Sequence, residues 1–130
     1  MKRFIVVDTS AVVRKIAKRI LTAEGASVSE AEAGDHLLEM CNYDMPDCVI
    51  VSSNLPDMEV QEAIAGIRNL PNGNHPKILL LTVEMNVGKI MRAKRAGADG
   101  YMLKPFTRQL LFDAIKSVAG TARTSSTEAA

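Results

Sequence analysis

Polar side chains directly follow several short apolar runs, and their types limit the chemistry that this sequence could do. In chain order they are a carboxylate, four hydroxyls and an ammonium group: Asp8, Thr9, Ser52, Ser53, Thr82 and Lys104. Carboxylate and hydroxyl oxygens could bind a hard cation such as Mg²⁺. The ammonium group of Lys104 could bind an anion, but with Asp8 near it we expect a partly buried ion pair instead.

Ser52 is a poor candidate nucleophile. A serine hydroxyl becomes nucleophilic beside a positioned base, and the only base expected near Ser52 is Asp8. The two histidines, His36 and His75, fall on a predicted helix and a predicted loop elsewhere. We therefore expect neither nucleophilic chemistry at Ser52 nor enzymatic activity.

The elements that must position these residues follow from hydrophobic periodicity. The predicted strands are 4–7, 26–31, 48–51, 78–81 and 101–103. The first predicted helix is capped by Ser10 and ends at Glu24 and Gly25. Three more helices are predicted over 34–42, about 59–69 and about 87–96. The last predicted helix is capped by Thr107 and ends by Gly120. The run 48–51 is wholly apolar and bounded by turn residues, as is typical of a central parallel strand covered on both faces.

Five strands alternating with five helices predict an α/β fold with a doubly wound (flavodoxin-like), five-stranded parallel sheet. Right-handed crossovers and the short length favour the strand order 2-1-3-4-5. In such a sheet the residues that follow the strands meet at one edge, where open α/β sheets bind their ligands. The polar residues named above should therefore lie close together.

Composition limits the class of protein. A length of 130 residues fits one domain, predicted over 1–120, and the stretch 121–130 lacks apolar periodicity and is predicted to be a disordered tail. A net charge of +1, 4% aromatic residues and no Trp give no reason to expect nucleic acid or membrane as a partner. Cys41 and Cys48 match no zinc or redox spacing and are expected to be reduced packing residues. No signal peptide is recognisable, so we expect a cytoplasmic protein.

Four segments of the sequence resemble the receiver domain of response regulators, the phosphate-accepting half of bacterial two-component signalling. They are 6–16, 46–59, 79–84 and 96–106. The last segment contains Ala-Gly-Ala-Asp-Gly-Tyr followed by Met-Leu-Lys-Pro-Phe, among the most specific motifs of that family. The resemblance covers residues 3 to about 119 and implies the same fold and a role in signal transduction.

The resemblance also implies a set of site residues, and this sequence departs from it at the acidic positions. In the family, two acids after the first strand and an acceptor aspartate after the third hold magnesium, and a histidine kinase donates the phosphoryl group to that aspartate. Asp8 matches the first acid, but Thr9 stands at the second and Ser52 at the acceptor position. The family's hydroxyl, lysine and switch aromatic are matched by Thr82, Lys104 and Tyr101. Asn54 completes this degenerate pocket, and Val60 replaces an expected glycine.

These departures predict a stand-alone pseudo-receiver: a receiver fold without its phosphoacceptor or magnesium site, which needs no cofactor and acts by contact, independently of phosphorylation. The expected partner is a histidine kinase, a phosphotransfer protein or another regulator. Two alternatives stay open, an effector that binds a cyclic dinucleotide and a receiver phosphorylated at a non-standard hydroxyl. Whether Thr82 and Tyr101 still switch between two positions also stays open.

Two basic helical surfaces are candidates for binding a partner. The helix after Ser10 is predicted to bury one apolar stripe, composed of Val13, Ile16, Ala17, Ile20 and Leu21. Its opposite side is predicted to form a docking face for an acidic partner, with Arg14, Lys15, Lys18 and Arg19. The helix over about 87–96 carries a second basic surface, which could meet a protein or the phosphates of a nucleotide, with Lys89, Arg92, Lys94 and Arg95.

Overall fold

The computed structural model describes residues 1–120, so the predicted tail 121–130 lies outside the described residues. These residues form a five-stranded parallel sheet in the order β2-β1-β3-β4-β5. The strands are β1 (Arg3–Val7), β2 (Ser27–Ala31), β3 (Cys48–Ser52), β4 (Lys77–Thr82) and β5 (Gly100–Leu103). The predicted doubly wound, flavodoxin-like fold and its strand order are confirmed.

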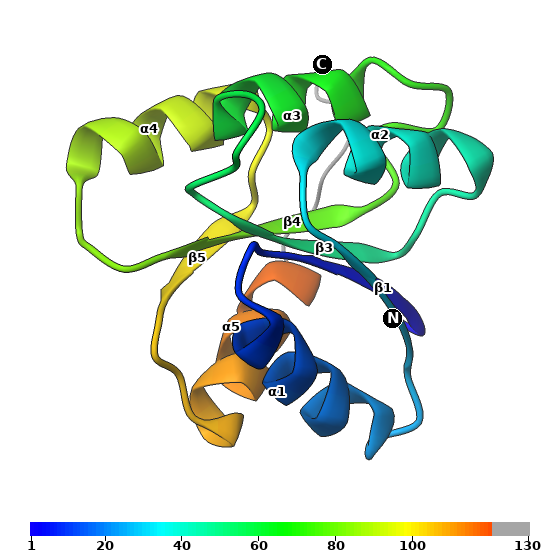
Figure 1. Cartoon of the computed structure of the whole chain (residues 1–130), viewed down its shortest axis with the longest axis vertical. Helices are drawn as coiled ribbons and strands as arrows, with labels where there is room; N and C mark the ends of the chain where they lie inside the picture. The colour runs from blue at the N-terminus through cyan, green and yellow to red at the C-terminus, as the bar shows by residue number, and fades with distance from the viewer. Residues whose placement is uncertain (121–130) are drawn as a thin grey trace.

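Helices cover both faces of this sheet (Figure 1). They are α1 (Ala11–Thr22), α2 (Gly34–Tyr43), α3 (Val60–Arg68), α4 (Val87–Ala96) and α5 (Arg108–Ala119). α2, α3 and α4 lie on one face, and α1 and α5 lie on the other. As predicted, Ser10 and Thr107 cap α1 and α5, because their side-chain oxygens accept hydrogen bonds from the amides of Val13 and Leu110. Within residues 1–120, every helix is too short or too polar to cross a bilayer.

Two apolar cores sandwich the sheet. One lies under α2, α3 and α4 and the other under α1 and α5. All five residues of β3 are buried, as a central strand covered on both faces requires. Cys41 and Cys48 are free and buried, as predicted, and burial raises the pKa of their thiols to about 11 and about 12. Both therefore stay protonated packing residues at neutral pH.

The face that α1 buries differs from the predicted stripe. Ile16 is 45% exposed, so its predicted burial is wrong. The buried residues of the helix are Arg14, Ala17 and Leu21. Arg14 takes an inward position because its guanidinium group donates a hydrogen bond to Glu30 on β2, which offsets the cost of burying its charge.

The loop after β3 is fixed against α2 by the carboxylate of Asp57, which the sequence pattern assigned only to a turn. Asp57 accepts hydrogen bonds from the amides of Gly34 at 2.8 Å and Asp35 at 2.9 Å, at the start of α2. The Gly34 amide is the main cause, and the Asp35 amide the next, of a lowered pKa at Asp57. A Cβ at Gly34 would lie 2.6 Å from the Sδ atom of Met58, so a larger residue here would require the Met58 side chain to move.

Arg68, the last residue of α3, joins the loop between α3 and β4 to the loop between α4 and β5. Its guanidinium group donates to the carbonyls of Gly73, Pro76 and Gly97 at 2.7 to 3.2 Å. It also forms an ion pair of 3.0 Å with Asp99, and the two side chains are 9% and 1% exposed. The contact therefore holds a nearly buried pair of charges together.

Replacing Arg68 with Met should lower the free energy of unfolding by about 3 kcal/mol, because the buried carboxylate of Asp99 loses the guanidinium group paired with it. Chemical denaturation at neutral pH measures this loss. Arg95→Met on the exposed side of α4 is the matched control and should cost less than about 0.5 kcal/mol. Equal losses in the two variants would contradict the role given to Arg68.

The carboxylate of Asp47 joins the amino ends of β1 and β3. It accepts hydrogen bonds from the amides of Lys2 at 3.0 Å and Arg3 at 2.9 Å, and it lies 2.9 Å from Nε2 of His75. The contact with His75 contributes most, and the Arg3 amide next, to a pKa of Asp47 that falls from 3.8 to about 2. This carboxylate is thus more stable as an anion in the folded chain than in the unfolded one.

Asp47→Asn should destabilise the chain at neutral pH and have less effect in acid. A carboxyl group with a lowered folded-state pKa stabilises the fold above its unfolded-state pKa, and this contribution is lost as the pH falls through the folded-state value. The difference in unfolding free energy between native chain and variant should be constant above about pH 5 and shrink between about pH 4 and about pH 2. Urea unfolding at a series of pH values measures it. A difference that does not vary with pH would refute the prediction.

Candidate functional site

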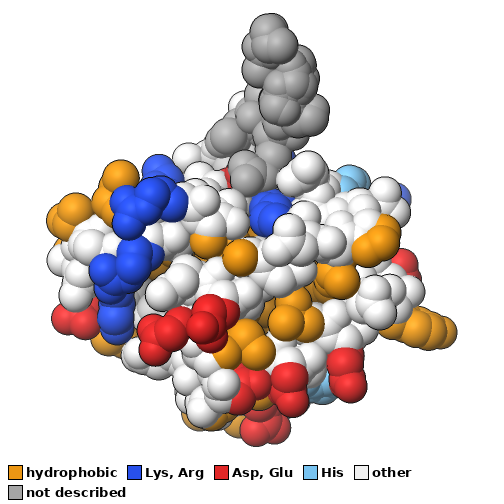
Figure 2. Space-filling model, turned by 90° about the horizontal axis from the view of Figure 1, so that it is seen from above, with side chains coloured by type: hydrophobic (Ala, Val, Ile, Leu, Met, Phe, Trp, Pro, Cys, Tyr) orange, Lys and Arg blue, Asp and Glu red, His pale blue; other side chains and the backbone are white. Residues whose placement is uncertain are grey.

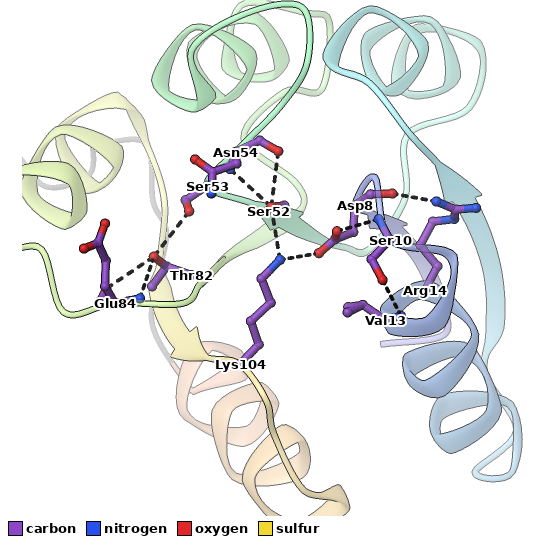
Figure 3. A network of polar contacts seen from close by, with 10 residues as sticks. All are labelled: Asp8, Ser10, Val13, Arg14, Ser52, Ser53, Asn54, Thr82, Glu84 and Lys104. Atoms are coloured by element: carbon purple, nitrogen blue, oxygen red, sulfur yellow. Dashed lines mark hydrogen bonds and ion pairs between the residues drawn. The ribbon is translucent and has the colours of Figure 1, made fainter.

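The carboxyl ends of β1, β3, β4 and β5 bring the predicted polar residues together at one edge of the sheet (Figure 3). Parallel strands end on the same side, so the residues at their ends meet there. Four of these residues are between 1% and 8% exposed: Asp8, Ser52, Ser53 and Thr82. Lys104 reaches into the same place from the end of β5. We call this group of five side chains the polar pocket.

The ammonium group of Lys104 occupies the centre of the polar pocket. Its Nζ atom lies 2.6 Å from Oδ2 of Asp8 and 3.4 Å from Oγ of Ser52. The predicted ion pair is therefore confirmed. The other carboxylate oxygen of Asp8 accepts a hydrogen bond of 2.9 Å from the amide of Ser10. Both oxygens of Asp8 are thus engaged by groups of the chain itself.

The hydroxyl of Thr82 is held by Ser53, a contact that the sequence pattern did not reveal. Ser53 Oγ lies 3.3 Å from Thr82 Oγ1. The Thr82 hydroxyl also donates to the carbonyl of Glu84 at 3.2 Å and accepts from the amide of Glu84 at 3.4 Å. The Thr82 hydroxyl therefore has its partners in the residues that follow β3 and β4, away from the ammonium group of Lys104 (Figure 3).

Three predicted site residues are more exposed than the side chains of the polar pocket. Thr9 and Asn54 are exposed, and Asn54 contacts Ser52 through its backbone, with its amide 3.2 Å from the Ser52 hydroxyl. Tyr101 projects from β5 with 39% of its surface exposed and lines a hollow together with Leu103. The pocket proper thus contains fewer residues than the sequence predicted.

The side chains of the polar pocket do not fit a magnesium ion. Magnesium prefers octahedral oxygen ligands that usually include carboxylates. Asp8 is the one carboxylate of the pocket, and Lys104 and Ser10 already bind it. Among residues 1–120, no three Asp, Glu, His or Cys side chains gather in a way that could hold a metal ion. Magnesium binding would require Asp8 to leave Lys104.

Arg14 does not belong to a docking surface, and its assignment to one is corrected. Its side chain is buried, and it donates to the backbone carbonyl of Asp8 at 2.7 Å and to Glu30 at 2.9 Å. Lys15 and Lys18 lie 2.8 and 3.7 Å from the same carboxylate. The hydrogen bond from Lys15 is the main cause of a lowered pKa at Glu30. Three of the four basic residues of α1 therefore have the Glu30 carboxylate within ion-pair distance, whereas Arg19 takes part in no ion pair formed within residues 1–120.

The basic residues of α4 have no such partner. Lys89, Arg92, Lys94 and Arg95 take part in none of the ion pairs formed within residues 1–120. Figure 2 shows Lys and Arg side chains gathered on the α4 side of the molecule, with apolar side chains beside them. The exposed apolar residues of α4 and the loop before it are Val83, Met85, Val87 and Met91. The α4 surface thus combines free cations with exposed apolar area.

The chain belongs to the response regulator receiver domain family. The family model matches residues 4–116, which is most of the sequence. The fold, the strand order and the lysine at the end of β5 described above agree with this membership. The chain is therefore a receiver domain of the kind that serves two-component signalling.

Several chemotaxis proteins are similar to this chain over nearly their whole length. The chemotaxis protein CheY of Halobacterium salinarum is 34% identical over 117 residues, which are 90% of this chain and 96% of that protein. Chemotaxis protein CheY1 of Helicobacter pylori is 30% identical, over 92% and 98% of the two chains. The structure of the chemotaxis response regulator CheY4 of Vibrio cholerae superposes with a TM-score of 0.85 at 28% identity, over 91% of this chain and 98% of that one.

Lys104→Met should lower the free energy of unfolding by about 3 kcal/mol, because it leaves Asp8 buried without its counter-charge. The double variant with Asp8→Asn should recover part of this loss, since no charge then remains unpaired. Lys116→Met, at an exposed position of α5, is the control and should change stability by less than about 0.5 kcal/mol. Thermal and chemical denaturation measure all three. A double variant less stable than Lys104→Met alone would contradict the ion-pair assignment.

Proposed function

We propose that this chain is a pseudo-receiver: a non-enzymatic module of two-component signalling that binds a protein partner independently of its own phosphorylation. The main observation that supports the proposal is the burial of Ser52 and its contact with Lys104. Ser52 stands at the family's acceptor position, 1% exposed and in contact with a lysine that is already paired with Asp8. The comparisons establish the family, and the loss of phosphorylation is our inference from this chain's residues.

The surroundings of Ser52 argue against its acting as a phosphoacceptor. A serine hydroxyl needs a base to take its proton. Lys104 presents an ammonium group, which is a donor and not a base. The carboxylate of Asp8 is tied to that ammonium group at 2.6 Å and is not free to accept a further proton from Ser52. Chemistry at a non-standard hydroxyl is therefore the weakest of the candidate functions.

The polar pocket is also satisfied without any ligand. Lys104 neutralises Asp8, Ser52 contacts the backbone of Asn54, and Ser53 contacts Thr82. A phosphoryl group would have to displace these contacts while finding no metal ion to balance its charge. These contacts support a structural role for the polar pocket, in which its side chains hold the domain in one conformation.

The partner that we propose is a protein regulator such as a histidine kinase or a phosphotransfer protein, bound through α4. The α4 cations favour an acidic partner because they have no ion pairs within the described residues, whereas Lys15 and Lys18 on α1 share Glu30. Exposed apolar side chains beside the cations supply area that excludes water from an interface. The names of the similar proteins support a place in signalling.

A cyclic dinucleotide is the second candidate ligand, favoured by the same four unpaired cations. Arginine binds phosphate through paired N–H donors, and α4 carries Arg92 and Arg95. A titration with a panel of cyclic dinucleotides, followed by calorimetry, separates the two candidates. Saturable binding that Arg92→Ala abolishes would favour the nucleotide over the protein partner.

The native chain incubated with acetyl phosphate and magnesium should show no added phosphoryl mass. Ser52→Asp alone should take up phosphoryl groups slowly, because the transition state still lacks a metal ion. The double variant Thr9→Asp, Ser52→Asp should react faster, since it gains a second ligand for magnesium. Intact-mass spectrometry over time measures all three. A phosphorylated native chain, or equal rates in single and double variants, would overturn the proposal.

Charge reversal on α4 should abolish partner binding and leave the fold intact. The variant is Lys89→Glu, Arg92→Glu, Arg95→Glu, and the partner is first isolated by pull-down with the native chain. Its melting temperature should stay within a few degrees of the native value, because these residues form no ion pairs in the described chain. Arg19→Glu on α1 is the control and should bind normally. Loss of binding in the control with retention in the α4 variant would reverse the assignment.

A further inference from the structure

A hollow beside the free edge of β2 lies apart from both the polar pocket and α4. Its volume is about 390 Å³. The neighbouring residues Ile5 of β1 and Ser29 of β2 line one side, and Met40 and Tyr43 of α2 line another. β2 turns small side chains to this face, Ser29 at the hollow and Ala31 in the core next to it, which leaves space beside α2.

The side chain of Tyr43 is unusually exposed for an aromatic residue. Tyr43 ends α2, lines the hollow and is 93% exposed, whereas the other tyrosine, Tyr101, is 39% exposed. Aromatic side chains supply much of the apolar area that is buried in cores and interfaces. An exposed ring next to a hollow lined in part by apolar residues such as Ile5 and Met40 is therefore a candidate contact surface.

The edge of β2 next to the hollow is open for strand pairing. The amide of Ser27 donates to the carbonyl of Lys2, so alternate residues of β2 bond to β1, and Val28 and Glu30 turn their amides and carbonyls outward. Edge strands are usually blocked by an outward lysine, a proline or a bulge. The sequence of β2, Ser-Val-Ser-Glu-Ala, contains neither lysine nor proline. The Glu30 carboxylate does not block the edge, since it is held by α1.

We propose that a second copy of this chain occupies this surface, in a symmetric dimer whose two β2 strands pair antiparallel about Ser29. In this register Val28 of each copy lies opposite Glu30 of the other, so their outward amides and carbonyls bond in pairs. The two hollows then meet across the shared edge, and each Tyr43 ring packs into the hollow of the other copy. One patch serves both copies, as a twofold axis requires.

The charges around the hollow favour a second copy over a strongly charged partner. Arg3 and Asp44 on its rim already form an ion pair of 3.2 Å, beside His36 and Glu39. A rim whose charges are partly balanced within the chain does not attract a strongly charged partner, so it favours a nearly neutral one. The formal net charge of the chain is +1, so two copies repel each other weakly.

Sedimentation velocity over a series from micromolar to millimolar chain tests the dimer. The native chain should show a reversible monomer–dimer equilibrium. Tyr43→Ser should raise the dissociation constant at least about 30-fold, the loss expected when a central aromatic residue of an interface is truncated. Ser29→Lys should do the same by placing two like charges at the axis. Tyr101→Ser is the matched control and should leave the constant unchanged, and circular dichroism checks that each variant is folded.

Tyr43 also provides a direct readout, because the chain has two Tyr and no Trp. In Tyr101→Phe, the fluorescence of Tyr43 should become less accessible to acrylamide as the dimer forms. A native chain that is monomeric at millimolar concentration would overturn the proposal, as would a dimer that Tyr43→Ser and Tyr101→Ser weaken equally. A monomer whose Tyr43 becomes protected only on addition of another protein would assign the surface to that protein and would also overturn it.

Discussion

The ion pair between Lys104 and Asp8 is the contact on which the polar pocket depends. It joins the loops after β5 and β1, residues 96 positions apart in the sequence, at a distance of 2.6 Å. The pair uses the carboxylate that a metal ion would need and the ammonium group that a phosphoryl group would need. With a hydroxyl at position 52, no second carboxylate of the polar pocket competes with Asp8 for Lys104.

The basic residues of α1 and α4 differ in whether they form ion pairs with carboxylates of the chain. Glu30 on β2 holds Arg14, Lys15 and Lys18, and Arg14 in turn binds the backbone of Asp8. α1 is therefore part of the support of the polar pocket. The cations of α4 have no equivalent carboxylate, so they keep their charge available for another molecule. Surface charge that is already paired contributes little to steering a partner, whereas unpaired charge contributes to the association rate.

The sequence predicts most of the fold, because strand order, caps and the meeting of Asp8, Ser52, Thr82 and Lys104 follow from periodicity and from the common direction of parallel strands. It does not predict contacts that depend on how a helix is rotated or how a loop is folded back. Arg14 is predicted to lie on the surface because its carboxylate partner, Glu30 on β2, is 16 positions away in the sequence. The hydrogen bond from the Gly34 amide to the Asp57 carboxylate joins residues 23 positions apart, and the local sequence of neither segment predicts it. The Ser53–Thr82 contact has the same long-range origin.

The central claim is that the polar pocket is satisfied by the chain itself and has lost its magnesium site. A magnesium titration of the native chain, followed through the backbone amide signals of the folded protein by NMR, tests it most directly. The account predicts no saturable shift at Asp8, Ser52 or Asn54 at physiological magnesium. Saturable shifts at these residues with a dissociation constant below about 1 mM, a binding free energy of about −4 kcal/mol, would contradict it.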